Sequence, residues 1–560
     1  MTQFTSRILF LLLLFSVIPV STATAGPGQA AVASAHPLAT EAGLEVLRQG
    51  GNAFDAAVAV SAALAVVEPS GSGLGGGGFW LIHRASDRRE VMIDGRETAP
   101  AAAHADMYLD AGGNHVREKS LNGPLAAAIP GLPAALDHLS KQYGKLTLKE
   151  TLGPAIRYAK DGFAVTGHYR KLVSFRREVL QRWPEGRRIF LKDGEVPPVG
   201  HLVVQKDLAE TLTRIADMGR DGFYRGETAT RLVEGAREHG GIWSLSDLEK
   251  YRVLERQPIH TRYHDIRITS ASPPSSGGIV LSQALGILEH FDLGYRDSIQ
   301  RKHLVIEAMR RAYRDRAVYL GDPDFVEIPV QRLLDGEYLE GLALSIDPER
   351  ATDSSLLGLF ELEQAGTSTT HFSVIDKDGN RVAATLSINL PFGSGFVPPG
   401  TGVLLNDEMD DFSSKPNTPN AYGLVGDEAN RIAPGKRPLS SMTPTFVETD
   451  DKVGILGTPG GSRIISMVLL GVLEFADRRP PSAWVSRPRY HHQYLPDEVQ
   501  FEQGGLTAEE QRALRQLGHK LNEKNRKYGN MQALMWYKPK NLLVGASDPR
   551  GEGSTRLTLH

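Results

Sequence analysis

The chain has 560 residues, and its 63 Lys and Arg nearly balance 66 Asp and Glu, which leaves a formal net charge of −3. This balance gives no electrostatic reason to expect nucleic acid or an acidic membrane surface as a partner. The sequence contains no cysteine, which excludes disulfides, thiolate metal sites and cysteine-based catalysis.

The first 25 residues have the three-part layout of a secretory signal peptide. A short segment ending at Arg7 is followed by the apolar run 8–20, and then by small residues up to Ala25. A transmembrane anchor is the alternative, but the apolar run is shorter than the roughly 20 residues that span a bilayer. We therefore expect residues 1–25 to be removed, which places the mature protein in a periplasm or outside the cell.

Two helices are expected next, at 38–49 and 54–67. The first ends at a glycine pair, and Asn52 is placed to cap the second. The second is almost wholly apolar and reads as a buried helix. Glycine-rich residues 71–78 lead into expected strands at 79–83 and 90–94.

Residues 120–345 are mainly helical in pattern, with strand-like pieces such as 266–270. The polar stretch 352–368 is the best internal boundary on the chain, and β-like segments follow it at 371–376 and 381–389. A further strand at 453–456 precedes an apolar helix at 463–475. This mixture of strands and helices predicts a layered α+β architecture.

The segment Lys377-Asp378-Gly379 predicts the register of the hairpin that it closes. A three-residue loop with glycine in the left-handed region pairs Asp376 with Asn380. Thr369 then lies opposite Ser387, and Asn389 shares that face. A two-residue loop would bring Ile388 opposite instead.

Few residues point to chemistry when taken singly. Hydroxyl residues at 367–370 are common turn and strand formers, and His371 points to the opposite face from its strand neighbours. The pair His491-His492 is a weak metal site for the same reason, and no spaced His or carboxylate set suggests a metal. The glycines at 75–78 lack the Lys-Ser/Thr of a P-loop. Gly460-Gly461 opens a helix after a strand, which suits either an oxyanion site or a tight turn.

Six segments in chain order resemble γ-glutamyltransferases. They lie at 38–57, 94–100, 369–374, 406–413, 436–442 and 457–462, and include Asp94-Gly95-Arg96-Glu97-Thr98-Ala99-Pro100, Thr369-Thr370-His371 and Gly457-Thr458-Pro459-Gly460-Gly461. The resemblance runs from about residue 30 to the C-terminus. It implies the N-terminal-nucleophile hydrolase fold, a four-layer αββα sandwich of the α+β class.

The resemblance also implies the roles of individual residues. Thr369 would be both the self-cleavage residue and the nucleophile, with its freed α-amino group as general base. The implied oxyanion hole consists of the N–H groups of Gly460 and Gly461. The residues implied to contact the α-carboxylate of the glutamyl group are Arg96, Ser440 and Ser441. Those implied to contact its α-ammonium group are Asn389, Glu408 and Asp411. Ser387 stands where many members carry threonine, and Tyr422 lies in a stretch, 416–435, that resembles the family's lid loop.

The implied activity is that of a self-processing γ-glutamyltransferase and glutathione hydrolase. It would pass the γ-glutamyl group of glutathione-like donors to water, amino acids or peptides through an ester on Thr369, without cofactor or metal. The implied subunits, 26–368 and 369–560, would form a heterodimer in one intertwined fold. One alternative is a cephalosporin (glutaryl) acylase of the same fold, which the lid loop and Asp411 disfavour. Another is an inactive exported binding protein, which would be expected to lose Thr369 or the glycine pair.

Overall fold

The computed structural model describes residues 26–295, 298–357, 369–413, 420–424, 426 and 428–558. The predicted signal peptide 1–25, residue Ser368 on the N-terminal side of the predicted cleavage bond, and parts of the lid stretch 416–435 therefore lie outside the described residues. Within the described part of the chain, no helix is both long enough and apolar enough to cross a membrane.

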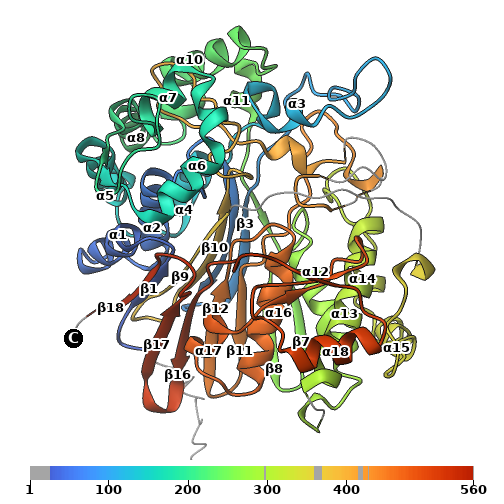
Figure 1. The fold of residues 1–560 in the computed structure, drawn as a ribbon. Helices are drawn as coiled ribbons and strands as arrows, with labels where there is room; N and C mark the ends of the chain where they lie inside the picture. Colours follow the sequence, from blue (N-terminus) through green and yellow to red (C-terminus); the bar gives the residue numbers. More distant parts are fainter. Residues whose placement is uncertain are drawn as a thin grey trace, which may run out of the picture.

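Two stacked sheets form the centre of the molecule (Figure 1). The first consists, in spatial order, of β18 (Ser554–Leu557), β1 (Ala31–Ser34), β9 (Thr370–Ile375), β10 (Arg381–Ser387), β2 (Gly77–Arg84), β3 (Arg89–Gly95) and β6 (Leu254–Arg256). The second consists of β17 (Leu542–Ser547), β16 (Gln532–Tyr537), β12 (Lys452–Gly457), β11 (Thr445–Glu448), β8 (Ile266–Ser270) and β7 (Ile259–Tyr263). Smaller sheets pair β13 (Tyr490–His491), β14 (Val499–Phe501) and β15 (Leu521–Glu523), and β4 (Phe163–Ala164) with β5 (Leu202–Val203).

Helices cover the outer face of each sheet (Figure 1). The first sheet is covered by helices that include α1 (Pro37–Arg48), α2 (Ala53–Val67), α4 (Leu132–Tyr143), α5 (Leu148–Asp161) and α8 (Lys206–Met218). The second is covered by α12 (Gly277–Leu288), α13 (Ser298–Tyr319) and α16 (Arg463–Ala476). The other helices are α3 (Arg117–Leu121), α6 (Gly167–Gln181), α7 (Pro184–Phe190), α9 (Asp221–Tyr224), α10 (Gly226–Glu238), α11 (Leu245–Lys250), α14 (Val330–Leu333), α15 (Gly336–Leu344), α17 (Pro481–Ser486) and α18 (Ala508–Gln516).

Alternation along the central strands separates the apolar cores and confirms the predicted αββα sandwich. In β2, Trp80 and Ile82 pack toward the helices of the first layer, whereas Leu81 packs between the sheets. Because successive strand residues point to opposite faces, one strand serves two cores. Across the inter-sheet space, Leu81 joins a cluster with Ile455 and Leu534 of the second sheet.

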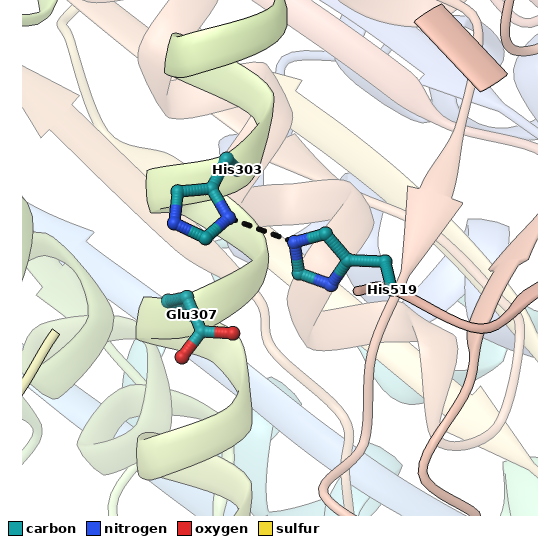
Figure 2. Close-up of side chains that lie close together, drawn as sticks. All are labelled: His303, Glu307 and His519. Atoms are coloured by element: carbon teal, nitrogen blue, oxygen red, sulfur yellow. Dashed lines mark hydrogen bonds between the residues drawn. The ribbon is translucent and has the colours of Figure 1, made fainter. Parts of the chain in front are cut away.

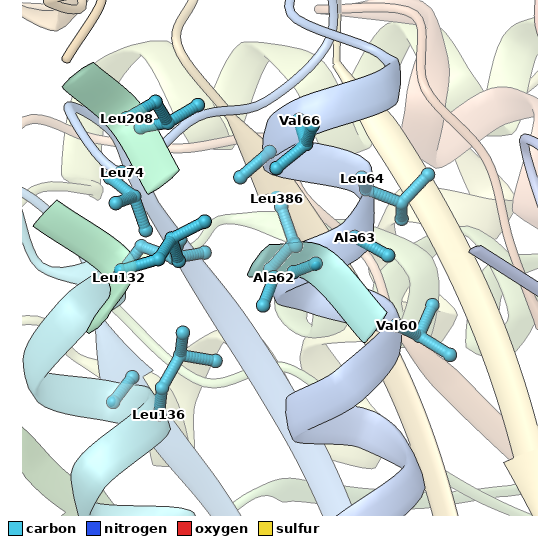
Figure 3. Close-up of a cluster of buried hydrophobic side chains, with 14 of the residues drawn as sticks. Val60, Ala62, Ala63, Leu64, Val66, Leu74, Leu132, Leu136, Leu208 and Leu386 are labelled. Atoms are coloured by element: carbon cyan, nitrogen blue, oxygen red, sulfur yellow. The ribbon is translucent and has the colours of Figure 1, made fainter. Parts of the chain in front are cut away.

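Helix α2 is the buried helix that the sequence predicts. Asn52 forms a capping box with Asp55, and all fifteen residues of the helix are buried. Figure 3 shows how residues of α2 such as Leu64 lie among side chains of several other elements. The helix is a fixed support for the strands against which it packs.

The β9–β10 hairpin has the predicted register. Asp376 N–H donates to the carbonyl of Asn380 at 3.0 Å, and Gly379 adopts φ 92°. Leu386 pairs with Thr370, so the next position outward sets Thr369 against Ser387. The expected strand 381–389 is too long, because β10 ends at Ser387 and Asn389 takes φ 71°. Asparagine is among the residues that tolerate this left-handed conformation.

Candidate functional site

The hairpin brings together the two hydroxyl residues that the sequence places opposite one another. Thr369 Oγ1 lies 3.5 Å from Ser387 Oγ, and both residues are buried. Ser387 Oγ also accepts from the backbone N–H of Asn389 at 2.8 Å, which fixes its orientation. The Thr369 hydroxyl is thus held at the end of a rigid strand, beside a second hydroxyl of fixed position.

A small pocket adjoins Thr369 on one side. Nine of the predicted site residues line it: Arg96, Thr369, Ser387, Asn389, Asp411, Tyr422, Ser440, Ser441 and Gly461. Its cavity measures about 20 Å³, which is room for about one water molecule. Glu408 is not a lining residue but is bonded to Arg96, and Gly460 lines a second pocket that Thr369 also borders.

Arg96 and Asp411 form a direct ion pair in the wall of the small pocket. Arg96 Nη2 donates to Asp411 Oδ2 at 2.6 Å, its Nη1 to Glu408 Oε2 at 2.7 Å, and its Nε to the carbonyl of Pro438 at 3.1 Å.

The carboxyl groups of Glu97, Glu408 and Asp411 all lie beside the guanidinium group of Arg96. Burial raises the pKa of Glu97 to about 7 and that of Glu408 well above its ordinary value. Although burial alone would lower it, the carboxylates of Glu408, Glu97 and Asp411 raise the pKa of Arg96. In the described structure Glu408 Oε1 and Asn389 Oδ1 are buried acceptors with no hydrogen-bond partner. Such atoms are costly to leave unpaired, so the pocket is complementary to an added cation with N–H donors.

Arg316 lines the same pocket, and sequence reasoning missed it. Its side chain, on α13, donates to Ser441 Oγ at 3.2 Å and to Ser276 Oγ at 3.0 Å. Among the described residues, no carboxylate oxygen lies within 4.0 Å of its guanidinium. Burial lowers the pKa of Arg316 to about 10. A buried guanidinium bound only to hydroxyl groups can accept an incoming carboxylate.

The Gly460-Gly461 pair lies in the turn before α16, not in the helix. Ser462 is the N-cap, and the helix begins at Arg463. The two glycines adopt φ 148° and 58°, which favours glycine at both positions. Within the described residues neither N–H donates a hydrogen bond, although both residues are buried. The ring of Tyr422 packs on Gly461, where an added Cβ would lie 2.2 Å from the ring.

A second and larger pocket also borders Thr369. Its cavity measures about 160 Å³, and Thr369 and Gly460 form part of its wall. Glu68, Lys171 and Arg526 also line it. Thr369 therefore borders both a small, charged pocket and a larger one, with Gly461 in the wall of the first and Gly460 in the wall of the second.

One cluster away from these pockets has the composition of a metal site. His303 and Glu307 of α13 approach His519, as Figure 2 shows. His303 Nδ1 and His519 Nε2 are hydrogen-bonded at 2.8 Å, and Glu307 accepts from Arg310 and Arg311. His519 Nδ1 is buried without a hydrogen-bond partner among the described residues, but the other potential ligand atoms are hydrogen-bonded within the protein, and Glu307 lies beside two cations. The cluster therefore fits an internal polar network better than a metal site.

Comparisons with known proteins agree over nearly the whole chain. The family model Gamma-glutamyltranspeptidase matches residues 39–557. A glutathione hydrolase proenzyme from Pseudomonas sp. (strain A14) is 42% identical over 551 residues, covering 96% of this chain and 95% of that protein. The crystal structure of cephalosporin acylase from Bacillus halodurans matches with TM-score 0.83 at 29% identity, covering 95% of this chain and 96% of that one. The crystal structure of Helicobacter pylori γ-glutamyltranspeptidase matches with TM-score 0.56 at 42% identity, covering 57% of this chain and 93% of that one.

Proposed function

Because this chain belongs to the γ-glutamyltranspeptidase family, we propose that it is a self-processing γ-glutamyltransferase and glutathione hydrolase. Its donors are glutathione and similar γ-glutamyl compounds, and its acceptors are water, amino acids and peptides. The carrying observation is the charge pattern beside Thr369. Asn389 Oδ1 and Glu408 Oε1 are unpaired acceptors for an ammonium, while Arg96 and Arg316 are donors for a carboxylate. These charges match the two groups on the α-carbon of a γ-glutamyl donor.

In the proposed reaction Thr369 Oγ1 attacks the γ-carbonyl carbon of the donor. The α-amino group of Thr369 takes the hydroxyl proton and later passes it to the leaving amine. The N–H groups of Gly460 and Gly461 stabilise the oxyanion, and Ser387 orients the attacking hydroxyl. A γ-glutamyl ester on Thr369 results, and water or an acceptor amine then cleaves it.

Self-cleavage before Thr369 is a necessary part of this proposal. While residue 369 is joined to Ser368, its nitrogen is an amide and cannot act as a base. Attack of Thr369 Oγ1 on the Ser368 carbonyl and hydrolysis of the resulting ester free the amine. We assign residues 26–368 to the large subunit and 369–560 to the small one, after removal of a signal peptide, 1–25, that directs export to a periplasm or the medium.

Two observations support this processing. The Pseudomonas relative is named a proenzyme. In addition, β9 and β10 of the proposed small subunit lie between β1 and β2 of the proposed large one, so two cleavage products would remain together as a heterodimer.

A glutaryl acylase is the second candidate, because the Bacillus halodurans acylase is similar over the whole fold. A glutaryl group carries the carboxylate but no ammonium. It would leave Asn389 Oδ1 and Glu408 Oε1 without a partner, and this observation favours the γ-glutamyl donor.

A comparison of γ-glutamyl and glutaryl p-nitroanilides on the purified, processed protein tests the proposal. We expect a higher kcat/KM for the γ-glutamyl donor, measured by release of p-nitroaniline. A preference for the glutaryl donor would identify an acylase instead. Activity on neither donor would refute both candidates.

A further inference from the structure

Glu68 is a carboxyl group that the proposed reaction does not use, although it lies beside the nucleophile. It is the C-cap residue of α2, and its backbone carbonyl accepts from the N–H groups of Gly71 and Ser72. Its Oε2 accepts from Thr370 Oγ1 at 2.5 Å, one residue beyond Thr369. The Glu68 backbone carbonyl and side-chain carboxyl group therefore each have a hydrogen-bonding partner.

The same carboxyl group lines the larger pocket together with Thr369 and Gly460. Thr369 borders both this pocket and the small pocket that contains Arg96, so a donor whose glutamyl end occupies the small pocket directs its leaving group here. An acceptor must enter by the same side, because it attacks the carbonyl carbon that the leaving group has left.

Three exposed cations stand on the rim of the larger pocket. They are Lys171 of α6 and Arg526 and Lys527 of the loop before β16. In the described part of the chain, no carboxylate oxygen lies within 4.0 Å of these side chains' charged nitrogens. Arg550, another lining residue, is held by Glu502 at 2.5 Å and is not free in this way. The pocket thus offers an inner carboxyl group and an outer set of unpaired positive charges.

Resting on the proposed function, we propose that this pocket is the acceptor site, with Glu68 binding the acceptor's amino group and Lys171, Arg526 and Lys527 attracting its carboxylate. The ligand class is an amino acid or short peptide with both termini free. In this pocket the ammonium group goes in toward Thr369, and the carboxylate stays at the rim. Only an amine held near Thr369 can attack the ester.

Glu68 also has a route for the proton that the amine must lose. Burial raises the pKa of Glu68 to about 7, which brings it toward that of an α-ammonium group. The ammonium passes one proton to the Glu68 carboxylate, and the neutral amine nitrogen then forms a bond to the γ-carbonyl carbon. The bond from that carbon to Thr369 Oγ1 breaks. The second nitrogen proton goes through the α-amino group to Oγ1, and Glu68 releases its proton to solvent.

The test measures how each turnover divides between transfer and hydrolysis. Processed enzyme is supplied with γ-glutamyl-p-nitroanilide and glycylglycine, and γ-glutamyl-glycylglycine and free glutamate are quantified. We expect Glu68→Gln to lower the ratio of transfer to hydrolysis by about tenfold or more, because the acceptor loses its charged partner. We expect Lys171→Ala combined with Arg526→Ala and Lys527→Ala to raise the KM for glycylglycine but not for glycylglycinamide, which has no carboxylate.

A matched variant separates acceptor binding from a structural role of the Glu68–Thr370 hydrogen bond. Thr370→Val removes that bond and keeps the carboxyl group, so the ratio should stay within about twofold of wild type. An unchanged ratio of transfer to hydrolysis in Glu68→Gln, with or without a loss of both activities, would overturn the acceptor site. The same fall of this ratio in Thr370→Val would also overturn it. Absence of p-nitroaniline release by the wild type would instead overturn the proposed function, and this inference with it.

Discussion

The ion pair between Arg96 and Asp411 makes donor choice a sensitive test of the small pocket. Asp411 Oδ2 accepts from Arg96 at 2.6 Å, and its Oδ1 accepts from Asn420 Nδ2 at 3.1 Å. We expect a γ-glutamyl donor to draw Asp411 onto its ammonium while Arg96 takes its carboxylate. Asp411→Asn keeps the shape of the side chain and removes only the charge. Arg96 keeps Glu408 as a partner, so the substituted protein should still fold.

The size of the effect follows from the burial of the pair. The Asp411 side chain is 13% exposed and that of Arg96 only 1%, so solvent screens their charges little. Two unit charges about 4 Å apart interact by about 4 kcal/mol at an effective dielectric constant of about 20. Leaving a substrate ammonium without its partner in such a site costs about 2–5 kcal/mol. At about 1.4 kcal/mol per tenfold, kcat/KM for γ-glutamyl donors should fall roughly 30-fold to several thousand-fold.

The assay compares γ-glutamyl and glutaryl p-nitroanilides on the same preparations. A glutaryl donor has no ammonium, and Asp411→Asn also removes a competitor for Arg96, so its kcat/KM should be unchanged or higher. Asp410→Asn is the matched control, because the Asp410 carboxylate accepts from Ser120 and from the N–H of Ala421 and does not line the pocket. Equal losses on both donors, or no loss on the γ-glutamyl donor, would show that Asp411 does not bind the α-amino group.

Three further predictions concern other parts of the structure. Thr369→Ala should remain a single inactive chain, whereas mass spectrometry of the wild type should find pieces of 343 and 192 residues, corresponding to 26–368 and 369–560; cleavage of the variant at the same bond would contradict the mechanism. Arg316→Gln should lower kcat/KM for both donors by roughly tenfold to a hundredfold, as loss of a charged hydrogen bond costs about 1.5–3 kcal/mol, and a loss on only one donor would argue against carboxylate binding. Burial lowers the pKa of His371 to about 3. At pH values below its ordinary pKa of about 6.5 the unfolded chain therefore binds a proton that the folded chain does not, so the free energy of unfolding falls as the pH falls below about 6.5. Unfolding free energies of the Thr369→Ala precursor between pH 7 and pH 5 should therefore fall less steeply when His371 is also replaced by glutamine, and parallel slopes would refute this.

Local chemistry made much of the hairpin and the family predictable. The register followed from one three-residue turn, because the position of Gly379 fixes every pair along two strands. The six motifs predicted the γ-glutamyltranspeptidase family, which the match over residues 39–557 confirms. Both kinds of evidence lie within short stretches of sequence.

Contacts between residues that are far apart in the chain could not be predicted from such short stretches. Arg316 is one of several arginines on α13, and only the packing of that helix against Ser441 distinguishes it from its neighbours. The direct pairing of Arg96 with Asp411 joins two residues that are 315 positions apart in the chain. The ordering of charge along the larger pocket has the same origin, since Glu68 and Arg526 come from opposite ends of the sequence.

Both sheets combine strands from the two sides of the proposed cleavage bond. Cleavage therefore changes the kinetic order of the folding reaction. In the first sheet β9 and β10 pair with β1 and β2, and in the second β11 pairs with β8. An uncut chain can reach this arrangement in a first-order process at any dilution. Once cut and fully unfolded, the two pieces would have to meet before either sheet could be completed, so recovery would be second order in protein. The active form would therefore persist by the slowness of its unfolding, with a lifetime set by a rate and not by an equilibrium.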